Sequence, residues 1–281
     1  MVIALEPAYT RTIDDLAALF NRAFAGYVGG DVHFTAETLA RFIARSNADL
    51  ELSQVIACDG QPVGFACVAR QGWTSRLASF GVVPEAAGAG VGKTAMLQLI
   101  DQAKRRGDHV YELEVIEQNP RAVRLYEGVG FQRVRRLVGY EAKSPQPDAR
   151  AQRAASALQS IDICDAAKVF FQHGAPDLPW QVSGAALVRQ SPPSVAYVLD
   201  HAYAVISDPV AEVVSLRGLI VPPELRRQGR ATRLMGAIFA RHPGKTWSLP
   251  AIMPEEIGGE LLAKLGFERT ALTQWHMRLG L

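Results

Sequence analysis

The sequence predicts an α/β chain that consists of two similar domains in tandem. Apolar stretches with the alternation of β-strands are interleaved with amphipathic helical stretches, a pattern typical of a sheet covered by helices. A glycine-rich turn after the strand at 80–83 recurs after residue 221, and the pair Gly130-Phe131 recurs as Gly266-Phe267 at almost the same separation. Features that repeat at nearly the same spacing indicate a duplicated domain. A chain of 281 residues is long enough for two such domains.

Composition excludes several classes of protein. The chain is 48% hydrophobic and 21% charged with a formal net charge of +2, which does not indicate an electrostatic nucleic-acid binder. No apolar run approaches the ~20 residues of a membrane span, and Glu6 and Pro7 interrupt the N-terminal stretch, so we expect a cytoplasmic protein without signal peptide or membrane contact. Cys58, Cys67 and Cys164 lack CxxC spacing, and we expect free thiols and no metal site.

Local signals place the elements of the first domain. Thr12 is a helix N-cap followed by acidic residues, and Asp59-Gly60 is a hairpin turn between two apolar stretches. Residues 26–34 form a loop rich in glycine. We therefore expect strands at 2–5, 54–58, 63–70, 74–83 and 109–116 and helices at 12–24, 35–46 and 92–106.

The turn at 84–92 has the composition of an anion-binding loop. Pro84 ends the preceding strand, and Gly88, Gly90 and Gly92 allow a tight turn into a helix that begins near Lys93. The first turn of a helix leaves backbone N–H groups without partners and carries partial positive charge, which suits phosphate. The ligand is either a nucleoside triphosphate or the pyrophosphate of coenzyme A.

The nucleotide alternative rests on residues 87–94, which fit a relaxed Walker A pattern. Lys93 would reach a γ-phosphate and Thr94 would hold magnesium. However, the next strand at 110–116 does not end in the Asp that such a hydrolase needs for its metal. A P-loop nucleotide hydrolase is therefore the less favoured alternative.

Two segments taken together carry a family resemblance. VVPEAAGAGVG at 82–92 followed by LEVIEQNPRAVRLYEGVGF at 113–131 resembles the GCN5-related N-acetyltransferase (GNAT) family, and the second segment is most similar to its ribosomal-protein alanine acetyltransferase branch. The resemblance implies two acyl-CoA N-acyltransferase domains, each a mixed, mainly antiparallel sheet flanked by helices. It also implies transfer of an acetyl group from acetyl-CoA to an amine by direct attack.

The resemblance also implies roles for individual residues. Tyr126 corresponds to the general acid, and Glu114, at the proposed base position of the branch, is a possible water-mediated base. Glu114 could instead pair with a nearby arginine, and Tyr126 could be a core aromatic residue. Ala87 stands where the family has Arg or Gln, so we expect weaker cofactor binding. The implied cofactor-binding residues are Val82, Val83, Ala87, Gly88, Ala89, Gly90, Val91, Gly92, Lys93, Asn119 and Tyr126.

The loop at 26–34 corresponds to family positions that line the acceptor pocket. Tyr27, Asp31 and His33 are therefore candidate acceptor contacts, although an ordinary solvated loop explains them equally well. The acceptor itself is expected to be a small-molecule amine or a peptide N-terminus.

The second copy has diverged from the first. Leu262 replaces the tyrosine, and the segment between the helix near 165–172 and the strand at 195–199 is too short for a full second helix. His201, Tyr203 and His276 could supply an acid in this copy, although single residues of these types on strands usually serve packing. The second copy either retains coenzyme A or only packs. Its candidate coenzyme A contacts are Val221, Arg226, Arg227, Gln228, Gly229, Arg230 and Ala231.

The expected organisation is a catalytic domain at 1–142, a linker at 143–156 and a degenerate second domain at 157–281. The fused copies would form a monomeric pseudo-dimer or a homodimer. A non-catalytic acyl-CoA-binding or sensor protein is the main alternative to an acetyltransferase.

Overall fold

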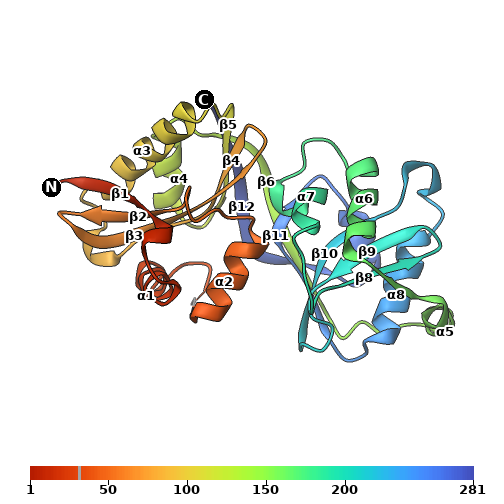
Figure 1. Cartoon of the computed structure of the whole chain (residues 1–281). Coiled ribbons are helices and arrows are strands. Elements are labelled where there is room, and N and C mark those ends of the chain that lie inside the picture. The colour runs from red at the N-terminus through yellow and green to blue at the C-terminus, as the bar shows by residue number, and fades with distance from the viewer. Residues whose placement is uncertain (31–32) are drawn as a thin grey trace. The chain divides into compact units, whose positions relative to one another are not determined.

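The computed structural model describes residues 1–30 and 33–281. The chain divides into two units, each with its own set of strands and helices (Figure 1). The first unit contains Met1–Arg135 together with Gln274–Leu281, and the second contains Arg136–Thr273. The last residues of the chain therefore belong to the same unit as the first ones.

The sheet of the first unit is mainly antiparallel. Its neighbouring strands pair antiparallel except for one parallel pair, β4 with β5. Left-handed backbone at Asp59 and Gly60 makes the tight turn between β2 and β3, as the sequence predicted. In sheet order the strands are β1 (Ile3–Pro7), β2 (Gln54–Cys58), β3 (Gln61–Gln71), β4 (Thr74–Val82), β5 (Val110–Ile116) and the end of β12 (Glu268–Gly280).

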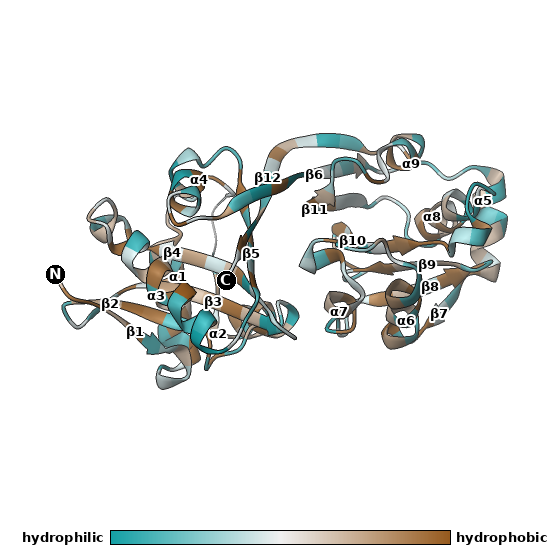
Figure 2. Ribbon diagram, turned by 90° about the horizontal axis from the view of Figure 1, so that it is seen from above, coloured by the Kyte–Doolittle hydropathy of each residue, from teal (hydrophilic) through white to brown (hydrophobic). Residues whose placement is uncertain are grey.

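Helices cover both faces of this sheet (Figure 1). On one face, α1 (Ile13–Ala23) and α2 (Ala36–Arg45) pack on Phe65 and Cys67. On the other, α3 (Val91–Arg105) and α4 (Pro120–Glu127) pack on Leu113 and Val115. In Figure 2, much of β2 and β3 has the brown of hydrophobic residues, as expected for strands whose two faces are both covered by helices. Alternate side chains of β5 consequently face different helical layers.

The second unit repeats the arrangement with a smaller helical layer. Its strands, in sheet order, are β7 (Gln159–Ile161), β8 (Val195–Leu199), β9 (Ala202–Ile206), β10 (Val213–Ile220), β11 (Thr246–Pro254) and β6 (Gln132–Lys143). Its helices are α5 (Ala149–Ala154), α6 (Ile163–His173), α7 (Gly184–Leu187), α8 (Arg230–Arg241) and α9 (Gly259–Lys264). The sequence predicted no full second helix between α6 and β8, and the structure has only the short α7 in the second half of that segment.

The expected domain boundaries differ from those of the structure. The chain enters the second unit inside β6, which continues without a break to Lys143 and pairs with β11. Residues 143–156 are not an open linker, because α5 lies within them and Ala151 is buried against Gly236 of α8. At the other end, residues 274–280 of β12 pair with β5 in the first unit. The change in composition at 143–156 therefore coincides with the helix α5. The boundary between the two units lies earlier, within the strand β6.

Among residues 1–30 and 33–281, no helix has the length and apolar character needed to cross a membrane.

Candidate active site

The glycine loop of the first unit has an open backbone. Gly88 and Gly90 adopt left-handed φ angles of 91° and 84°, and a Cβ built on either would meet no atom within 4 Å. The first helical hydrogen bond of α3 runs from the N–H of Thr94 to the carbonyl of Gly90, so the N–H groups of Val91 and Gly92 precede the helical ladder. This space and these donors fit a pyrophosphate group. Lys93 is exposed at the same helix end.

The backbone of β4 next to the loop is partly free. The N–H of Val83 bonds the carbonyl of Val63 on β3. Since successive residues of a strand direct their N–H and C=O groups to opposite sides, those of Val82 point away from β3. Val83 is buried, with 1% of its surface exposed. Of the two expected backbone contacts, Val82 is therefore the available one.

The strands β4 and β5 separate beside this loop. Their parallel pairing extends from Thr74 with Val110 to Leu77 with Leu113 and ends there. Beyond it, residues 79–82 still pair with β3, and residues 114–116 still pair with β12. The facing edges of the two strands are thus unpaired with each other.

Tyr126 lies on α4 next to the separated strands. Its ring packs edge-on against Phe80 and Phe131, with centroids 6.5 and 5.9 Å apart, and 7% of the residue is exposed. Burial raises the pKa of its hydroxyl above the usual value, and interactions with Tyr27 and Tyr111 act in the same direction. Tyr126 is therefore protonated at neutral pH. Within the described residues its hydroxyl makes no hydrogen bond.

Asn119 is the N-cap of α4. Its Oδ1 accepts a hydrogen bond of 3.1 Å from the N–H of Ala122. This contact explains the residue type at position 119 by helix capping and leaves the amide nitrogen of Asn119 for other contacts.

Glu114 is held in a buried ion pair with Arg76 of β4. Nη2 and Nε of Arg76 lie 2.7 and 3.0 Å from Oε2 of Glu114, and the two side chains are 5% and 3% exposed. The guanidinium stabilises the ionised carboxylate. The arrangement matches the arginine-paired alternative for Glu114, and the sequence pattern gave no indication of which arginine it would be.

The acceptor-loop residues have different surroundings. Tyr27 is half-buried and packs edge-on against Phe24 at 5.1 Å. A Cβ on Gly29 would lie 2.8 Å from both the Tyr27 ring and the side chain of Ile116, so this loop packs closely on the end of β5. His33 is exposed. Asp31 lies outside the described residues.

The corresponding loop of the second unit uses its arginines internally. Arg226 donates to the carbonyls of Val221 and His173 at 2.9 and 3.1 Å. Arg230 and Arg233 both bind the carboxylate of Asp200, which lies in the turn between β8 and β9. Arg230 also contacts Gln228, and Gly229 and Arg227 have left-handed backbone. Ala231 is half-buried behind them. The guanidinium groups of Arg226, Arg230 and Arg233 are therefore already bonded within the unit.

His276 lies in the first unit and not in the second, where the sequence placed it. The register of β12 sets it directly opposite Glu114. Sequence reasoning named His276 as a candidate acid but assigned it to the wrong copy, because no local pattern reveals which sheet a terminal strand will join. Arg76 is the site residue that sequence reasoning missed.

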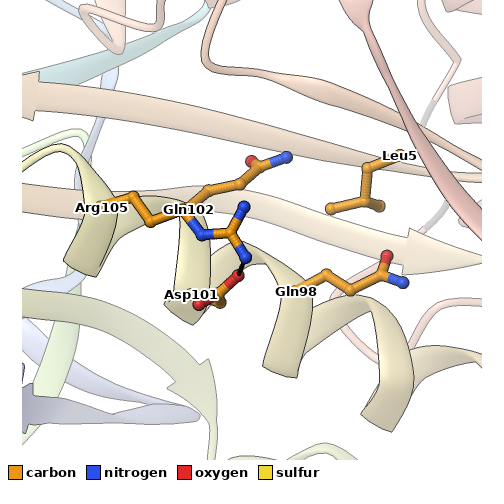
Figure 3. A pocket seen from close by; sticks show the side chains of 5 residues that line it. All are labelled: Leu5, Gln98, Asp101, Gln102 and Arg105. Atoms are coloured by element: carbon orange, nitrogen blue, oxygen red, sulfur yellow. Dashed lines mark ion pairs between the residues drawn. The ribbon is translucent and has the colours of Figure 1, made fainter.

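The pocket drawn in Figure 3 lies elsewhere on the first unit. It has a volume of about 300 Å³ and is lined by Leu5 and by one side of α3, where Arg105 and Asp101 form an ion pair of 2.6 Å. It contains none of the site residues described above. Among the described residues, no group of acidic, histidine and cysteine side chains is arranged to hold a metal ion.

The model of the Acetyltransferase (GNAT) family matches residues 13–131, which lie in the first unit. This stretch of the chain is therefore similar to the GNAT family, whose members use acetyl-CoA as co-substrate.

Two curated proteins are similar over shorter stretches. Streptothricin acetyltransferase of Streptomyces lavendulae is 33% identical over 87 residues, which are 30% of this chain and 46% of that protein. The N-alpha-acetyltransferase RimI of Mycobacterium tuberculosis is 42% identical over 79 residues, which are 27% of this chain and 48% of that protein. The chain thus spans about half the length of the curated relatives it matches.

Solved structures share the fold of the whole chain. A GCN5-related N-acetyltransferase from Sphaerobacter thermophilus is 14% identical with a TM-score of 0.69, and the match covers 99% of this chain and 95% of that one. A tandem GNAT protein from the clavulanic acid biosynthesis pathway is 15% identical with a TM-score of 0.63, covering 99% and 98%. The chain therefore has a tandem GNAT fold.

Proposed function

We propose that the first unit transfers an acetyl group from acetyl-CoA to an amine. The observation that carries this proposal is the open glycine loop directly beside the separated strands β4 and β5, with a protonated Tyr126 next to them. Acetyl-CoA supplies the acetyl group as a thioester. The backbone of Val82 and the N–H groups of residues 87–93 would hold the pantetheine arm and the pyrophosphate.

Tyr126 is the proposed general acid. A thiol with a pKa near ~8.5 leaves as thiolate and can take a proton from a phenol that is still protonated at pH 7. The raised pKa of Tyr126 means that its hydroxyl carries a proton at neutral pH. The role of Glu114 as a water-mediated base remains a prediction, and its ion pair with Arg76 counts against that role because the carboxylate oxygens already accept hydrogen bonds from the guanidinium.

The acceptor is proposed to be an amine of low pKa, such as a peptide α-amine. Deprotonating a lysine-like amine at pH 7 costs roughly 4.6 kcal/mol, against about 1 kcal/mol for an α-amine. One similar protein is named for an N-α-acetyltransferase activity and the other for acetylation of streptothricin, so both a peptide N-terminus and a small molecule are supported. The half-buried Tyr27 and the exposed His33 are candidate contacts for either.

The P-loop alternative loses support from the sheet. The strand that precedes the loop pairs antiparallel with β3, whereas P-loop strands lie in parallel sheets with helical crossovers. The exposed Lys93 remains available to a coenzyme A phosphate.

Calorimetric titration with acetyl-CoA tests the proposed site. Gly90→Trp should abolish binding because the indole fills the space at the loop, whereas Gly229→Trp is the matched control in the second unit and should leave the first site unchanged. Binding lost only in Gly229→Trp would refute the assignment. A second site in the wild type that disappears in Gly229→Trp would mean that the second copy also binds coenzyme A.

The variant Tyr126→Phe separates an enzyme from a sensor. An acetyltransferase should lose about 10²-fold or more in kcat while acetyl-CoA binding is retained. A wild-type chain that binds acetyl-CoA and transfers nothing to a panel of α-amine peptides and small amines would favour the sensor alternative.

A further inference from the structure

The final strand of the chain brings a buried imidazole to the site. His276 is 0% exposed and lies opposite Glu114 in the antiparallel pair of β5 and β12, so their side chains are neighbours on one face of the sheet. Nε2 of His276 lies 3.3 Å from Oε2 of Glu112, and Nε of Arg278 lies 3.2 Å from the same oxygen. Glu112 thus connects His276 and Arg278.

The bond to Glu112 determines which nitrogen of His276 carries the proton. Burial alone would raise the pKa of Glu112, but the hydrogen bond from His276 together with the charge and hydrogen bond of Arg278 outweighs it and holds the pKa below its usual range. An ionised carboxylate only accepts hydrogen bonds, so Nε2 of His276 must be the donor. In the neutral imidazole, Nδ1 then carries the lone pair. Nδ1 is buried and has no hydrogen-bond partner within the described residues.

The other groups near His276 are already committed. Glu114 is paired with Arg76, and Arg278 is bound to Glu112. Burial raises the pKa of Cys67, the thiol beside Arg76, to about 12. A buried acceptor without a partner in polar surroundings is the kind of atom to which ordered water binds. Among these groups, His276 is therefore the one that still has a free acceptor atom, Nδ1, to which a proton can bind.

The location suits a proton acceptor for the proposed reaction. Glu114, opposite His276, is the first residue of β5 beyond the end of its pairing with β4. The side chains of Glu114 and Arg76 lie on the face near Cys67, which packs on the α1 and α2 layer, whereas Tyr126 packs in the α3 and α4 layer. The acid and the imidazole are thus on opposite faces of the sheet where the strands separate.

We propose that Nδ1 of His276, held by Glu112, accepts the proton of the acceptor amine through a water molecule. The inference rests on the proposed acetyl transfer. An N–H bond of the attacking amine breaks, the water relays the proton, and an N–H bond forms at Nδ1. The resulting imidazolium is stabilised by the carboxylate of Glu112, as carboxylate–imidazole pairs are in other general bases. The step involves no oxidation or reduction.

The variant His276→Gln tests this assignment. Its amide can keep the hydrogen bond to Glu112 but cannot take up a proton. With a peptide bearing an N-terminal alanine as acceptor, kcat/KM should fall about 10²-fold or more at pH about 7. The loss should shrink above pH about 9, where the α-amine is already neutral. A loss equal at both pH values, or no loss, would overturn the proposal.

A matched control and a second readout complete the test. His242→Gln changes a half-buried histidine of the second unit, which contacts Tyr197 at 2.9 Å, and should leave kcat/KM unchanged. Nitrogen NMR of the imidazole should show a proton on Nε2 and none on Nδ1 of His276, and the opposite tautomer would also refute the proposal. A wild type that transfers nothing to the peptide refutes acetyl transfer to α-amines, whereas an active wild type with an unaffected His276→Gln refutes only the role of His276.

Discussion

Removing the arginine of the buried ion pair in the first unit should destabilise that unit strongly. In Arg76→Met, the carboxylate of Glu114 keeps its 3% exposure but loses its Nη2 and Nε donors at 2.7 and 3.0 Å. A buried charge left without its partner typically costs about 3–5 kcal/mol. Replacing both residues, as in Arg76→Met with Glu114→Met, should recover most of that loss, because the uncompensated charge is gone.

An exposed pair on the same unit provides the control. Arg105 and Asp101 are 2.6 Å apart, but their side chains are 78% and 54% exposed, so Arg105→Met should cost less than about 1 kcal/mol. Urea denaturation measures both variants. With a slope of about 2–3 kcal/mol per M, Arg76→Met should lower the midpoint by about 1 M or more. Equal midpoints for Arg76→Met and Arg105→Met would show that burial does not determine the strength of these pairs.

Three further substitutions test separate parts of the structure. The carboxyl of Asp108 has a lowered pKa because hydrogen bonds from Ser75 and nearby arginines outweigh the effect of burial. Its stabilisation is therefore present above the unfolded pKa of ~3.9 and disappears as the pH falls through the lower folded value. Asp108→Asn should cost about 1.5–3 kcal/mol of unfolding free energy at pH 7. It should also make the unfolding midpoint fall less steeply as the pH is lowered into the acid range, and an unchanged pH dependence would contradict this. Thr35 caps α2 through a capping box, so Thr35→Ala should cost about 1 kcal/mol in urea denaturation, whereas no loss would mean that the cap is not formed in solution. Trp247 is fully buried against Phe239 in the second unit, and Trp247→Ala should cost about 3–5 kcal/mol there, so an unaltered thermal transition would argue against this core.

The glycine loop could be predicted from the sequence because its signals are local. A proline that ends a strand and glycines that adopt left-handed backbone act within a few residues of one another. The loop before α3 and the Asp59-Gly60 turn therefore lie where the sequence placed them. The family resemblance gave Tyr126 its position, and burial explains why its hydroxyl keeps its proton.

The surroundings of the carboxylates required the tertiary structure. Glu114 was recognised as a costly acid in a central strand, but its partner Arg76 comes from a different strand, and its neighbour His276 comes from the far end of the chain. Strand pairing brings together residues that are distant in sequence, and the pattern of one strand does not reveal its neighbours.

The sequence by itself determined the duplicated α/β fold, the glycine loop and the divergence of the second copy, because periodicity, glycine spacing and repeated motifs are properties of the chain alone. Only the tertiary structure decided that β12 completes the first sheet, that β6 belongs to the second unit, and that Arg230 and Arg233 bind Asp200. The physical reason is that hydrogen bonds between strands and contacts between charges form through space, and folding, not sequence distance, selects the partners.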